Sequence, residues 1–372
     1  MPSLKNIAAQ SARHFLAGSY SWGRRLGLYD PGPEPIRYIA EKADWVIRQD
    51  ALSYAQALNA VHPGLVAVTD RPELATGRIA HFGSQFIWQA WAKALDQDTR
   101  CLITYFHGRP EDGPDMALHV DFFMRNLHRL QKIVTAAGRV ERRLLDWGVP
   151  RRKLALVPLG IDLQLFRPPG EDKRREARQT FGVPPDRLCI GSFQKDGEGW
   201  GEGLSPKLIK GPDIFVEAVE KLSKDFPVFV LLTGPARGYV KKRLEKAGIP
   251  YAHHVLPRAD MVSEAFHALD LYIVASREEG GPKAVLESLA SGVSLVSTRV
   301  GMAEDVVRHE INGLLVDAPD ALQLADQAGR LLADPALAGR LRAQGLQDIQ
   351  DYSWDRVAAL LYERAYRSLL ER

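Results

Sequence analysis

Short apolar runs alternate with longer amphipathic stretches along most of this chain. Continuous apolar runs bounded by Gly, Pro or Asp are typical of buried parallel strands, which have no polar face. The stretches between them have helical periodicity, as residues 214–222 illustrate. This alternation predicts an α/β protein in which helices connect parallel strands by right-handed crossovers. The predicted strands are 44–48, 65–69, 78–82, 101–106, 133–136, 154–158, 188–193, 227–233, 271–276, 293–298 and 312–317.

The strand–helix series occurs twice, which indicates two domains. The pattern is interrupted over residues 166–187 by Pro and Gly residues and a charged run, which we interpret as a linker. One continuous sheet is the alternative, but about eleven strands would strain a single open sheet. The predicted domains are residues 1–165 and 166–352, followed by a C-terminal helix over 353–372 whose apolar face must dock on another surface.

Residues 1–40 do not follow this pattern. One face of a predicted helix carries only apolar residues up to Phe15, while Lys5 and Arg13 lie elsewhere and Arg24 and Arg25 follow. Such a helix either packs on its own domain or lies on a membrane surface. The apolar face consists of Leu4, Ile7, Ala8, Ala12 and Phe15.

Composition excludes several classes of protein. Hydrophobic residues make up 45% of the 372 and charged residues 26%, which is ordinary for a globular chain. The two cysteines, Cys101 and Cys189, exclude a disulfide scaffold or a cysteine zinc site and fit a reducing compartment. No apolar run approaches the ~18 residues of a membrane span, and the first residues do not have the order of a secretory signal.

Charge is distributed unevenly, although the net charge of +3 is too small to indicate a nucleic-acid partner. Residues 1–155 contain 21 Lys and Arg against 15 Asp and Glu, whereas the remainder contains 28 against 31. A basic first half and a slightly acidic second half suggest different partners, with a chance surface imbalance as the alternative.

The segment 276–292 carries the most chemistry. It follows a predicted strand, and a helix is expected to begin at Pro282, because proline suits the first helical position. Gly280 and Gly281 leave bare backbone N–H groups at the helix N-terminus, which favours a phosphate or diphosphate at the carboxyl edge of the sheet. Glu279 precedes this anion site, and Glu287 lies roughly 7–8 Å further along the helix.

The two carboxylates extend the expected anion site to a nucleotide sugar. A carboxylate accepts hydrogen bonds from vicinal hydroxyls, so Glu287 is placed for the ribose and Glu279 for the sugar. Each one alone has an ordinary alternative: Glu279 as a first-turn acid that favours the helix dipole, and Glu287 as part of a solvated helix face.

These residues resemble the donor-site signature of the retaining, two-Rossmann-domain (GT-B) glycosyltransferases. The family motif is Glu, seven residues, Glu, matched by Glu279 and Glu287. Residues 296–317 are similar to the family's run after the motif, residues 133–168 to its passage into the second domain, and the C-terminal helix to one that crosses back onto the first domain. The resemblance implies two Rossmann-like domains whose parallel sheets face each other across a cleft, and transfer from a nucleotide-diphosphate sugar.

The resemblance also implies roles for single residues. Glu287 would hold the donor ribose, Glu279 would contact the donor sugar, and Lys210, in a Lys-Gly pair, would neutralise the diphosphate. The family's arginine after the first strand of the second domain is missing, and Lys195 or Lys207 would have to replace it. A lysine lacks the bidentate fork of arginine, and either residue could instead be a solvated loop lysine. The glycine-rich stretch 197–203 around Trp200 would close over a substrate or be an unstructured loop.

The first half is expected to take the acceptor. His107 ends a strand and is placed by the resemblance near the reacting sugar, so it is a catalytic candidate together with Glu279. His81 and Arg109 are acceptor-side candidates, with a core histidine and an ordinary loop as their alternatives. Asp96-Gln97-Asp98 precedes a strand and is expected to be a solvated turn, so no metal and no cofactor are predicted.

Together these observations predict a retaining, metal-independent glycosyltransferase of the hexosyl- or N-acetylhexosaminyl-transferase class. Its expected partners are a nucleotide sugar, a glycan or lipid-linked acceptor such as those of polysaccharide biosynthesis, and an anionic membrane surface. Its expected place is the cytoplasm, at the inner face of the membrane. A sugar-nucleotide epimerase on the same fold and a catalytically silent nucleotide-sugar-binding module are the alternatives.

Overall fold

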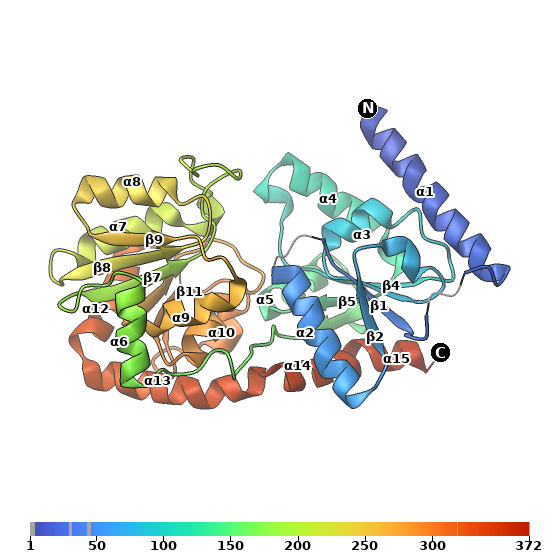
Figure 1. Cartoon of the computed structure of the whole chain (residues 1–372). Helices are drawn as coiled ribbons and strands as arrows, with labels where there is room; N and C mark the ends of the chain where they lie inside the picture. Colours follow the sequence, from blue (N-terminus) through green and yellow to red (C-terminus); the bar gives the residue numbers. More distant parts are fainter. Residues whose placement is uncertain (1–3, 30–31, 43–45, 318, 372) are drawn as a thin grey trace. The chain divides into compact units, whose positions relative to one another are not determined.

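The computed structural model describes residues 4–29, 32–42, 46–317 and 319–371 (Figure 1). The chain divides into two compact units, each with its own sheet and core. The first unit comprises Met1–Gly160 together with Trp354–Arg372, and the second comprises Ile161–Ser353. Residues 161–165, which the sequence assigned to the first domain, therefore belong to the second unit. Among the described residues, no helix is long and apolar enough to cross a bilayer.

The first unit contains a parallel sheet of six strands in the order β2-β1-β3-β4-β5-β6. β1 lies between β2 and β3, with Ile36 in register with Val66 on one side and Ile79 on the other. The chain therefore continues from β1 to β2 on one side and then crosses to β3 on the other side. In open α/β sheets, ligands bind outside the carboxyl ends of the strands where the winding direction changes in this way. The strands are β1 (Ile36–Ile39), β2 (Val66–Thr69), β3 (Ile79–Phe82), β4 (Arg100–Thr104), β5 (Leu130–Thr135) and β6 (Leu154–Leu156).

The first strand differs from the one predicted at 44–48. β1 is the run IRYI, all four residues of which are buried, and the charge of Arg37 is paired with Glu34 at 2.8 Å. Residues 46–48 instead begin the helix α2 (Val46–Val61), while 43–45 lie outside the described residues. The Trp-Val-Ile triplet misled the prediction because a short apolar run does not distinguish a strand from a buried helix turn.

Several helices belong to the first unit, among them α1 (Leu4–Arg25), which contacts α3 and the turn after β2 (Figure 1). Towards its end α1 is anchored, because Ser21 donates to Asp96 at 2.7 Å and Tyr20 Oη accepts from Arg71 at 2.5 Å. Phe15 nevertheless remains 75% exposed and Trp22 64% exposed. The other helices before the C-terminal segment are α3 (Gln85–Trp91), α4 (Pro114–Arg125) and α5 (Gly138–Asp146), with 3-10 turns η1 (Pro72–Ala75), η2 (Pro110–Asp112), η3 (Leu127–Arg129) and η4 (Arg151–Lys153).

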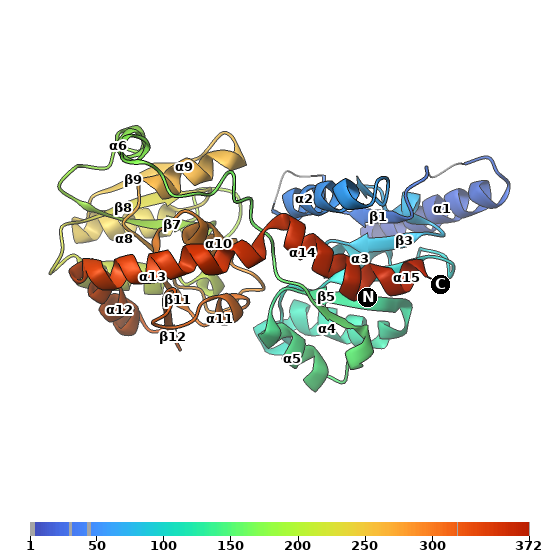
Figure 2. The same ribbon diagram turned by 90° about the horizontal axis from the view of Figure 1, so that it is seen from below.

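The C-terminal segment completes the core of the first unit. It consists of α14 (Trp354–Leu361), a π-helical turn η8 (Tyr362–Tyr366) and α15 (Arg367–Leu370), which run along this unit in Figure 2. Val357, Leu361 and Tyr366 are fully buried in the same apolar cluster as residues of α2. Gly160 lies against the Trp354 ring, which would be 2.4 Å from a Cβ at this position.

The second unit is also a six-stranded parallel sheet, in the order β12-β11-β10-β7-β8-β9. β7 is flanked by β8 and β10, so the chain reverses its direction of winding there, between β7 and β10. The strands are β7 (Leu188–Phe193), β8 (Val228–Thr233), β9 (Tyr251–His254), β10 (Leu271–Val274), β11 (Ser294–Thr298) and β12 (Leu314–Val316). β9 was not predicted, because this edge strand reads YAHH and is only half-buried.

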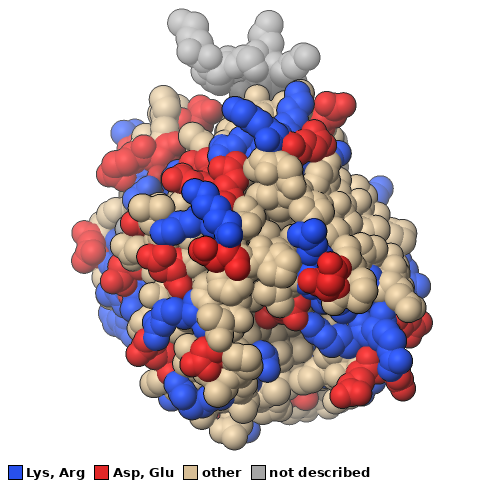
Figure 3. All heavy atoms as spheres, turned by 90° about the vertical axis from the view of Figure 1, so that its left-hand side faces the viewer, with Lys and Arg blue, Asp and Glu red and all other residues tan. Residues whose placement is uncertain are grey.

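Helices enclose this sheet on both faces. They are α6 (Glu171–Thr180), α7 (Pro212–Leu222), α8 (Gly238–Ala247), α9 (Val262–His267), α10 (Lys283–Ala290), α11 (Ala303–Val306), α12 (Ala321–Ala333) and α13 (Pro335–Asp348), with 3-10 turns η5 (Leu208–Lys210), η6 (Ala259–Met261) and η7 (Ile349–Tyr352). On the face of this unit seen in Figure 3, basic and acidic side chains are intermixed.

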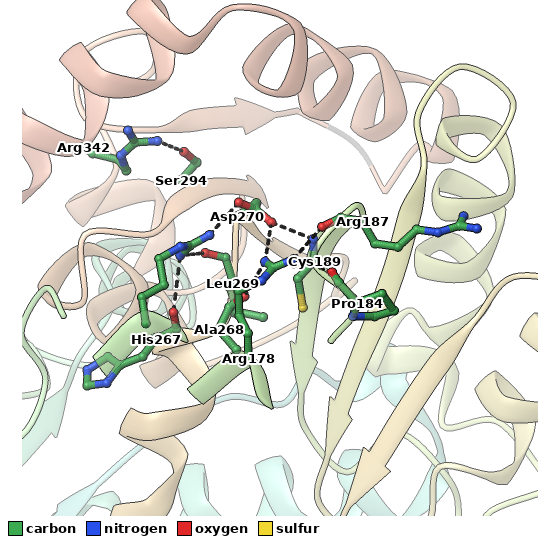
Figure 4. A network of polar contacts seen from close by, with 11 residues as sticks. Arg178, Pro184, Arg187, Cys189, His267, Ala268, Leu269, Asp270, Ser294 and Arg342 are labelled. Atoms are coloured by element: carbon green, nitrogen blue, oxygen red, sulfur yellow. Dashed lines mark hydrogen bonds and ion pairs between the residues drawn. The ribbon is translucent and has the colours of Figure 1, made fainter. Parts of the chain in front are cut away.

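The charged run in the predicted linker is the helix α6, which is attached to the sheet by an ionic network (Figure 4). Arg174 and Arg178 contact the two carboxylate oxygens of Asp270 at 2.7 and 3.2 Å. Asp270 also accepts from the backbone N–H of Cys189 at 2.7 Å, at the start of β7. The arginines therefore bind the helix to the amino edge of the sheet, and this stretch is part of the second unit.

Candidate functional site

The carboxyl ends of β7 and β10 form the centre of the candidate site in the second unit. The two strands are joined there by a hydrogen bond from the backbone N–H of Phe193 to the Tyr272 hydroxyl, at 2.8 Å. The loop after β7 leads to Lys210, and the loop after β10 carries Glu279, Gly280 and Gly281. The change of winding direction thus brings together two loops that are distant in sequence.

Lys210 and Glu279, both donor-site candidates, are in direct contact. Lys210 Nζ lies 2.5 Å from Glu279 Oε1, and Ser276 Oγ donates to the same oxygen at 2.9 Å. The Lys210 side chain is 27% exposed and that of Glu279 11% exposed, so the pair lies at the bottom of the loops and still reaches solvent. The ammonium and the carboxylate that the sequence assigned to the diphosphate and the sugar are therefore adjacent.

The backbone conformation at Gly211 positions Lys210. Gly211 has φ +64°, and a Cβ there would lie 1.9 Å from the carbonyl oxygen of Ala275, so only glycine fits. The Lys210 carbonyl accepts from Gln194 Nε2 at 3.1 Å. These contacts place the ammonium against the loop that follows β10.

An ion pair holds that second loop to the N-terminus of α7. The guanidinium of Arg277 contacts Asp213 in a bidentate pair at 2.8 and 2.6 Å, and the hydrogen bond to Asp213 raises the pKa of Arg277. Arg277 also donates to the carbonyl oxygen of Leu208 at 2.6 Å. The loops after β7 and β10 are therefore fixed to each other as well as to the sheet.

Glu287 lies on α10 and is half-buried. Burial raises the pKa of Tyr272, and the charges of Glu287 and Glu279 add to that increase, so both carboxylates lie within electrostatic reach of this hydroxyl. The helix begins one residue later than predicted: Pro282 is the N-cap, with ψ 98°, and Lys283 is the first helical residue. Proline adopts this extended conformation readily, because its φ near −69° is compatible with an extended backbone as well as with a helix.

The two glycines before α10 are held by a third loop. The backbone N–H of Met302 donates to the Gly280 carbonyl at 3.1 Å. Gly301 has φ +46°, and a Cβ there would lie 2.5 Å from the carbonyl oxygens of Glu279 and Gly280. This close backbone packing fixes the course of the chain at Gly280 and Gly281, where the sequence placed a diphosphate.

The glycine-rich stretch is a small anchored hairpin, which differs from both the mobile cover and the unstructured loop considered from sequence. Gly197 bridges to Pro206, and the N–H of Glu198 donates to Ser205 at 2.9 Å. Its backbone packs on Ala236, whose carbonyl oxygen would lie 2.4 Å from a Cβ on Gly197 and 2.2 Å from one on Gly203. Gly197 and Gly203 thus serve close packing, whereas a Cβ on Gly199 or Gly201 would have no atom within 4 Å.

The two lysines proposed to replace the missing arginine lie at the base of this hairpin. Lys195 Nζ lies 3.7 Å from the ring centroid of Trp200, an exposed side chain, in a cation–π contact. Lys207 is half-buried, and its backbone N–H donates to the Asp196 carbonyl at 2.7 Å. Lys195 is therefore already paired with an aromatic ring.

Arg237 is a residue of this edge that sequence reasoning missed. Its fully buried guanidinium donates to the carbonyl oxygens of Ser192 and Thr233 at 2.6 and 2.9 Å and forms an ion pair with buried Asp196 at 3.0 Å. Burial lowers the pKa of Arg237 and raises that of Asp196, and each charge counteracts the shift of the other. Arg237 therefore anchors the hairpin to the ends of β7 and β8. Its position shortly after the apolar run 227–233 could have identified it from the sequence as a residue at the carboxyl edge of the sheet.

In the first unit, His107 and Arg109 lie in the loop after β4. Gln85 clamps this loop, because its amide donates to the His107 carbonyl at 2.7 Å and accepts from the N–H of Phe106 at 2.8 Å. His107 is half-buried, and the exposed Arg109 contacts Asp112 at 2.8 Å. Both residues therefore lie at the carboxyl edge of this sheet.

His81 is a core residue, which corrects its assignment to the acceptor side. It is 1% exposed, and its ring nitrogens contact Tyr366 Oη at 2.6 Å and Thr104 Oγ1 at 3.0 Å. Burial lowers the pKa of His81 to about 3, so the ring is neutral near physiological pH. Its role is to join β3 to the C-terminal segment.

The Asp-x-Asp sequence lies at the amino edge of the first sheet, where its carboxylates hold α1. Asp96 accepts from Ser21, and Asp98 contacts Arg24 at 3.4 Å and Arg25 at 3.3 Å. Among the described residues, no group of three or more His, Cys, Asp or Glu side chains is arranged to hold a metal ion.

Comparison with known proteins adds a family match over part of the chain. Residues 204–348 match the family model described as "Glycosyl transferases group 1". The D-inositol 3-phosphate glycosyltransferase of Xylanimonas cellulosilytica is 30% identical over 229 residues, which are 58% of this chain and 52% of that protein. The lipopolysaccharide core biosynthesis mannosyltransferase LpsB of Rhizobium meliloti is 26% identical over 230 residues, or 59% and 60% of the two chains. The chain thus spans about half to three fifths of the length of these curated relatives.

Solved structures share the fold over most of the chain. Anabaena Alr3699/HepE in complex with UDP has a TM-score of 0.72 at 16% identity and covers 91% of this chain and 100% of its own. Sucrose-phosphate synthase from Thermosynechococcus elongatus has a TM-score of 0.70 at 18% identity, with 91% and 100% covered. At these identities the likeness establishes the two-Rossmann-domain architecture alone.

Proposed function

We propose, from the confirmed resemblance to GT-B glycosyltransferases, that this protein transfers a sugar from a nucleotide-diphosphate sugar to a glycan or lipid-linked acceptor with retention of configuration. Residues 204–348, which match the group 1 family model, include Lys210, Glu279 and Glu287. The observation that carries the proposal is the 2.5 Å contact of Lys210 with Glu279 at the ends of β7 and β10. The solved structure of Anabaena HepE with UDP supports a nucleotide as part of the donor.

The donor would compete with Glu279 for the Lys210 ammonium. The diphosphate would accept from Lys210 and from the backbone N–H groups near Gly280 and Gly281 at the start of α10. Lys195 or Lys207 would contribute a further cation from the base of the hairpin. Glu287 would accept hydrogen bonds from the ribose hydroxyls, and Glu279, released from Lys210, would contact the sugar.

In the proposed reaction, the bond between the anomeric carbon and the diphosphate oxygen breaks and the acceptor hydroxyl bonds to the same face of that carbon. The acceptor proton passes to the departing diphosphate oxygen. The negative charge of the leaving group grows in the transition state, where fixed cations and N–H groups stabilise it most. Cations and a helix N-terminus suffice for this, so we propose a transfer that needs no metal or cofactor. From the family resemblance we also propose His107 as a catalytic residue and Arg109 as an acceptor contact.

A catalytically silent binding module is the second candidate function, and one observation favours it. The arginine that the family carries after the first strand of this domain is missing, and Arg237, at the same sheet edge, is buried and held by Asp196 and backbone carbonyls. The diphosphate would then be held by lysines alone, which lack a bidentate fork.

Incubation with a set of labelled nucleotide sugars tests these alternatives, with and without a membrane lipid extract. Transfer of label to a lipid or glycan supports the proposed function, and conversion to an epimer supports an epimerase. Saturable binding with neither reaction supports the binding module. A catalytically inactive Lys210→Ala preparation controls for contaminating transferases.

We further propose that the protein works at the inner face of the cytoplasmic membrane. The excess of basic residues over residues 1–155 and the exposed Phe15 and Trp22 on α1 support this location. Each surface cation contributes about 1 kcal/mol of attraction to an anionic leaflet, screened within a Debye length. Co-sedimentation with anionic vesicles that declines as salt increases is the expected result, and no binding at low salt would contradict it.

A further inference from the structure

Three arginines line a cavity of about 310 Å³ in the first unit, remote in the fold from the carboxyl edge that carries His107. We call it the arginine cavity. Arg78 directly precedes β3 and Arg100 begins β4, so the cavity lies at the amino edge of the sheet. It is lined by Arg24, Pro35, Gly77, Arg78 and Arg100.

Gly77 brings the guanidinium of Arg24 into the cavity wall. Gly77 has φ +70°, and a Cβ there would lie 2.1 Å from Arg24 Cζ and 2.4 Å from both terminal nitrogens. The guanidinium therefore lies flat against a bare backbone position that no other residue could provide. The N–H of Gly77 is itself fixed by Thr99 Oγ1 at 2.9 Å.

The other two guanidiniums are held in place by backbone carbonyls. Arg78 donates to the carbonyl oxygens of Glu34, at 2.8 Å, and Gly32, and Arg100 donates to the carbonyl oxygen of Leu369. A carbonyl fixes the orientation of a guanidinium, and each guanidinium has five N–H donors. Arg24 contacts a carboxylate, but Asp98 is 59% exposed and is shared with Arg25.

We infer that the arginine cavity binds a phosphate group. Arginine presents a planar fork that matches phosphate oxygens. Three such forks in one wall, two oriented by backbone carbonyls and one packed against Gly77, form a site for an anion. The volume admits a phosphate together with part of the molecule that carries it. Phosphate binding here does not require that the protein transfer a sugar.

A membrane lipid headgroup and a small phosphorylated molecule share this chemistry. Phe15 and Trp22 on α1 are 75% and 64% exposed. At about 100° per residue, they lie on the opposite face of the helix from Arg24, so the experiment has to distinguish the two sources.

The decisive experiment compares Arg24→Gln with Arg25→Gln. The two arginines are adjacent and share Asp98, but only Arg24 lines the cavity. Titration calorimetry with inorganic phosphate at constant ionic strength, in the Lys210→Ala background to weaken phosphate binding at the donor site, should give saturable binding. We expect at least a tenfold loss of affinity for Arg24→Gln and less than a twofold change for Arg25→Gln. No saturable binding, or equal losses, would overturn the inference.

A measurement on the unaltered protein guards against a variant that misfolds. Phosphate should slow the modification of Arg24 by phenylglyoxal at least threefold, while modification of Arg25 proceeds at the same rate; equal rates at both residues would contradict the site. Vesicles of phosphatidylglycerol and phosphatidylcholine identify the source. Vesicle binding that is lost in Arg24→Gln and kept in Arg25→Gln supports a lipid headgroup, and phosphate binding without vesicle binding supports a small phosphorylated ligand.

Discussion

The contact between Lys210 and Glu279 joins the cation proposed for the diphosphate to the carboxylate proposed for the sugar. The pair is only partly exposed, so each charge compensates the desolvation of the other. Glu279 and Glu287 were selected from the sequence because their type and spacing suit a nucleotide sugar, and Lys210 was selected from the family resemblance. Their mutual contact could not be predicted, since it depends on the left-handed turn at Gly211 and on the winding reversal between β7 and β10.

Replacing Lys210 with alanine should reduce transfer about a hundredfold or more, because its charge meets a leaving group that becomes more negative in the transition state. The free energy of unfolding should change by no more than about 1 kcal/mol, as for a partly exposed pair. Lys221→Ala, on α7 of the same unit, serves as the control. Equal losses of stability and activity would identify Lys210 as a structural residue.

Glu287→Gln should weaken donor binding while leaving the fold intact. A hydrogen bond to a charged group contributes roughly 1.5–3 kcal/mol, so calorimetry with the nucleoside diphosphate should show about a tenfold or greater loss. Glu217→Gln, an exposed position on α7, should bind normally. Unchanged affinity in Glu287→Gln would remove this residue from the ribose site.

His81 should make the protein sensitive to acid. Its folded pKa, about 3, lies below the ordinary value of 6.5, so the unfolded state binds a proton first as the pH falls. Stability is therefore present in full above pH 6.5 and is lost by up to about 1.4 kcal/mol per pH unit between 6.5 and about 3. Urea denaturation of His81→Gln should show a shallower dependence on pH than the wild type, and parallel slopes would contradict this.

The predicted secondary structure differs from the observed one mainly at turns and edge strands and agrees with it in the central strands. Ten of the eleven predicted strands overlap observed ones, because buried parallel strands are continuous apolar runs. β1 and β9 were not predicted, because their burial depends on neighbouring residues. Arg37 in β1 is paired with Glu34, and β9 lies at an edge of its sheet. The helix α6 was interpreted as part of a linker because of its charged run, and the reason it packs on the second unit, the binding of its arginines to Asp270 ninety-odd residues away, is not visible in the sequence.

Gly211, in the turn between η5 and α7, and Gly248, at the end of α8, form a matched pair for substitution by alanine, because both have a left-handed backbone conformation. Gly248 ends α8 with φ +67°, and a Cβ at this position would have no atom within 4 Å, so alanine there should cost only the left-handed conformation, about 1–2 kcal/mol. Gly211→Ala adds the clash with the Ala275 carbonyl and should cost about 1–3 kcal/mol more. It should also displace Lys210 and reduce donor affinity. Equal stability of the two variants in urea would contradict this account.

The two units each contain a complete sheet and an apolar core, so each unit has its own source of folding stability. Sequence predicted this division from a repeated strand–helix series. The reason the last helix belongs to the first unit is visible only in three dimensions, where Tyr366 reaches His81 across 285 positions of sequence.

Urea should therefore unfold the protein in two transitions, one for each unit. Tryptophan fluorescence and far-ultraviolet circular dichroism should give different amplitudes for the two transitions. A nucleoside diphosphate at a hundred times its dissociation constant should stabilise only the second unit, by about 2.7 kcal/mol. Lys210→Ala should abolish that selective shift. A single transition that moves as a whole with ligand would show that the two units unfold together.

The participation of residues 354–371 in the first core has a consequence for synthesis on the ribosome. The second unit is inserted within the first, so all of its residues must be translated before α14, η8 and α15 become available. At about 5–20 residues per second, the nascent first unit waits some ten to forty seconds with the surface that will receive Val357, Leu361 and Tyr366 still open. During that interval, the inserted unit is the part of the chain that can complete its fold, and a chaperone that covers the α2 face would protect the first unit until its last helix arrives.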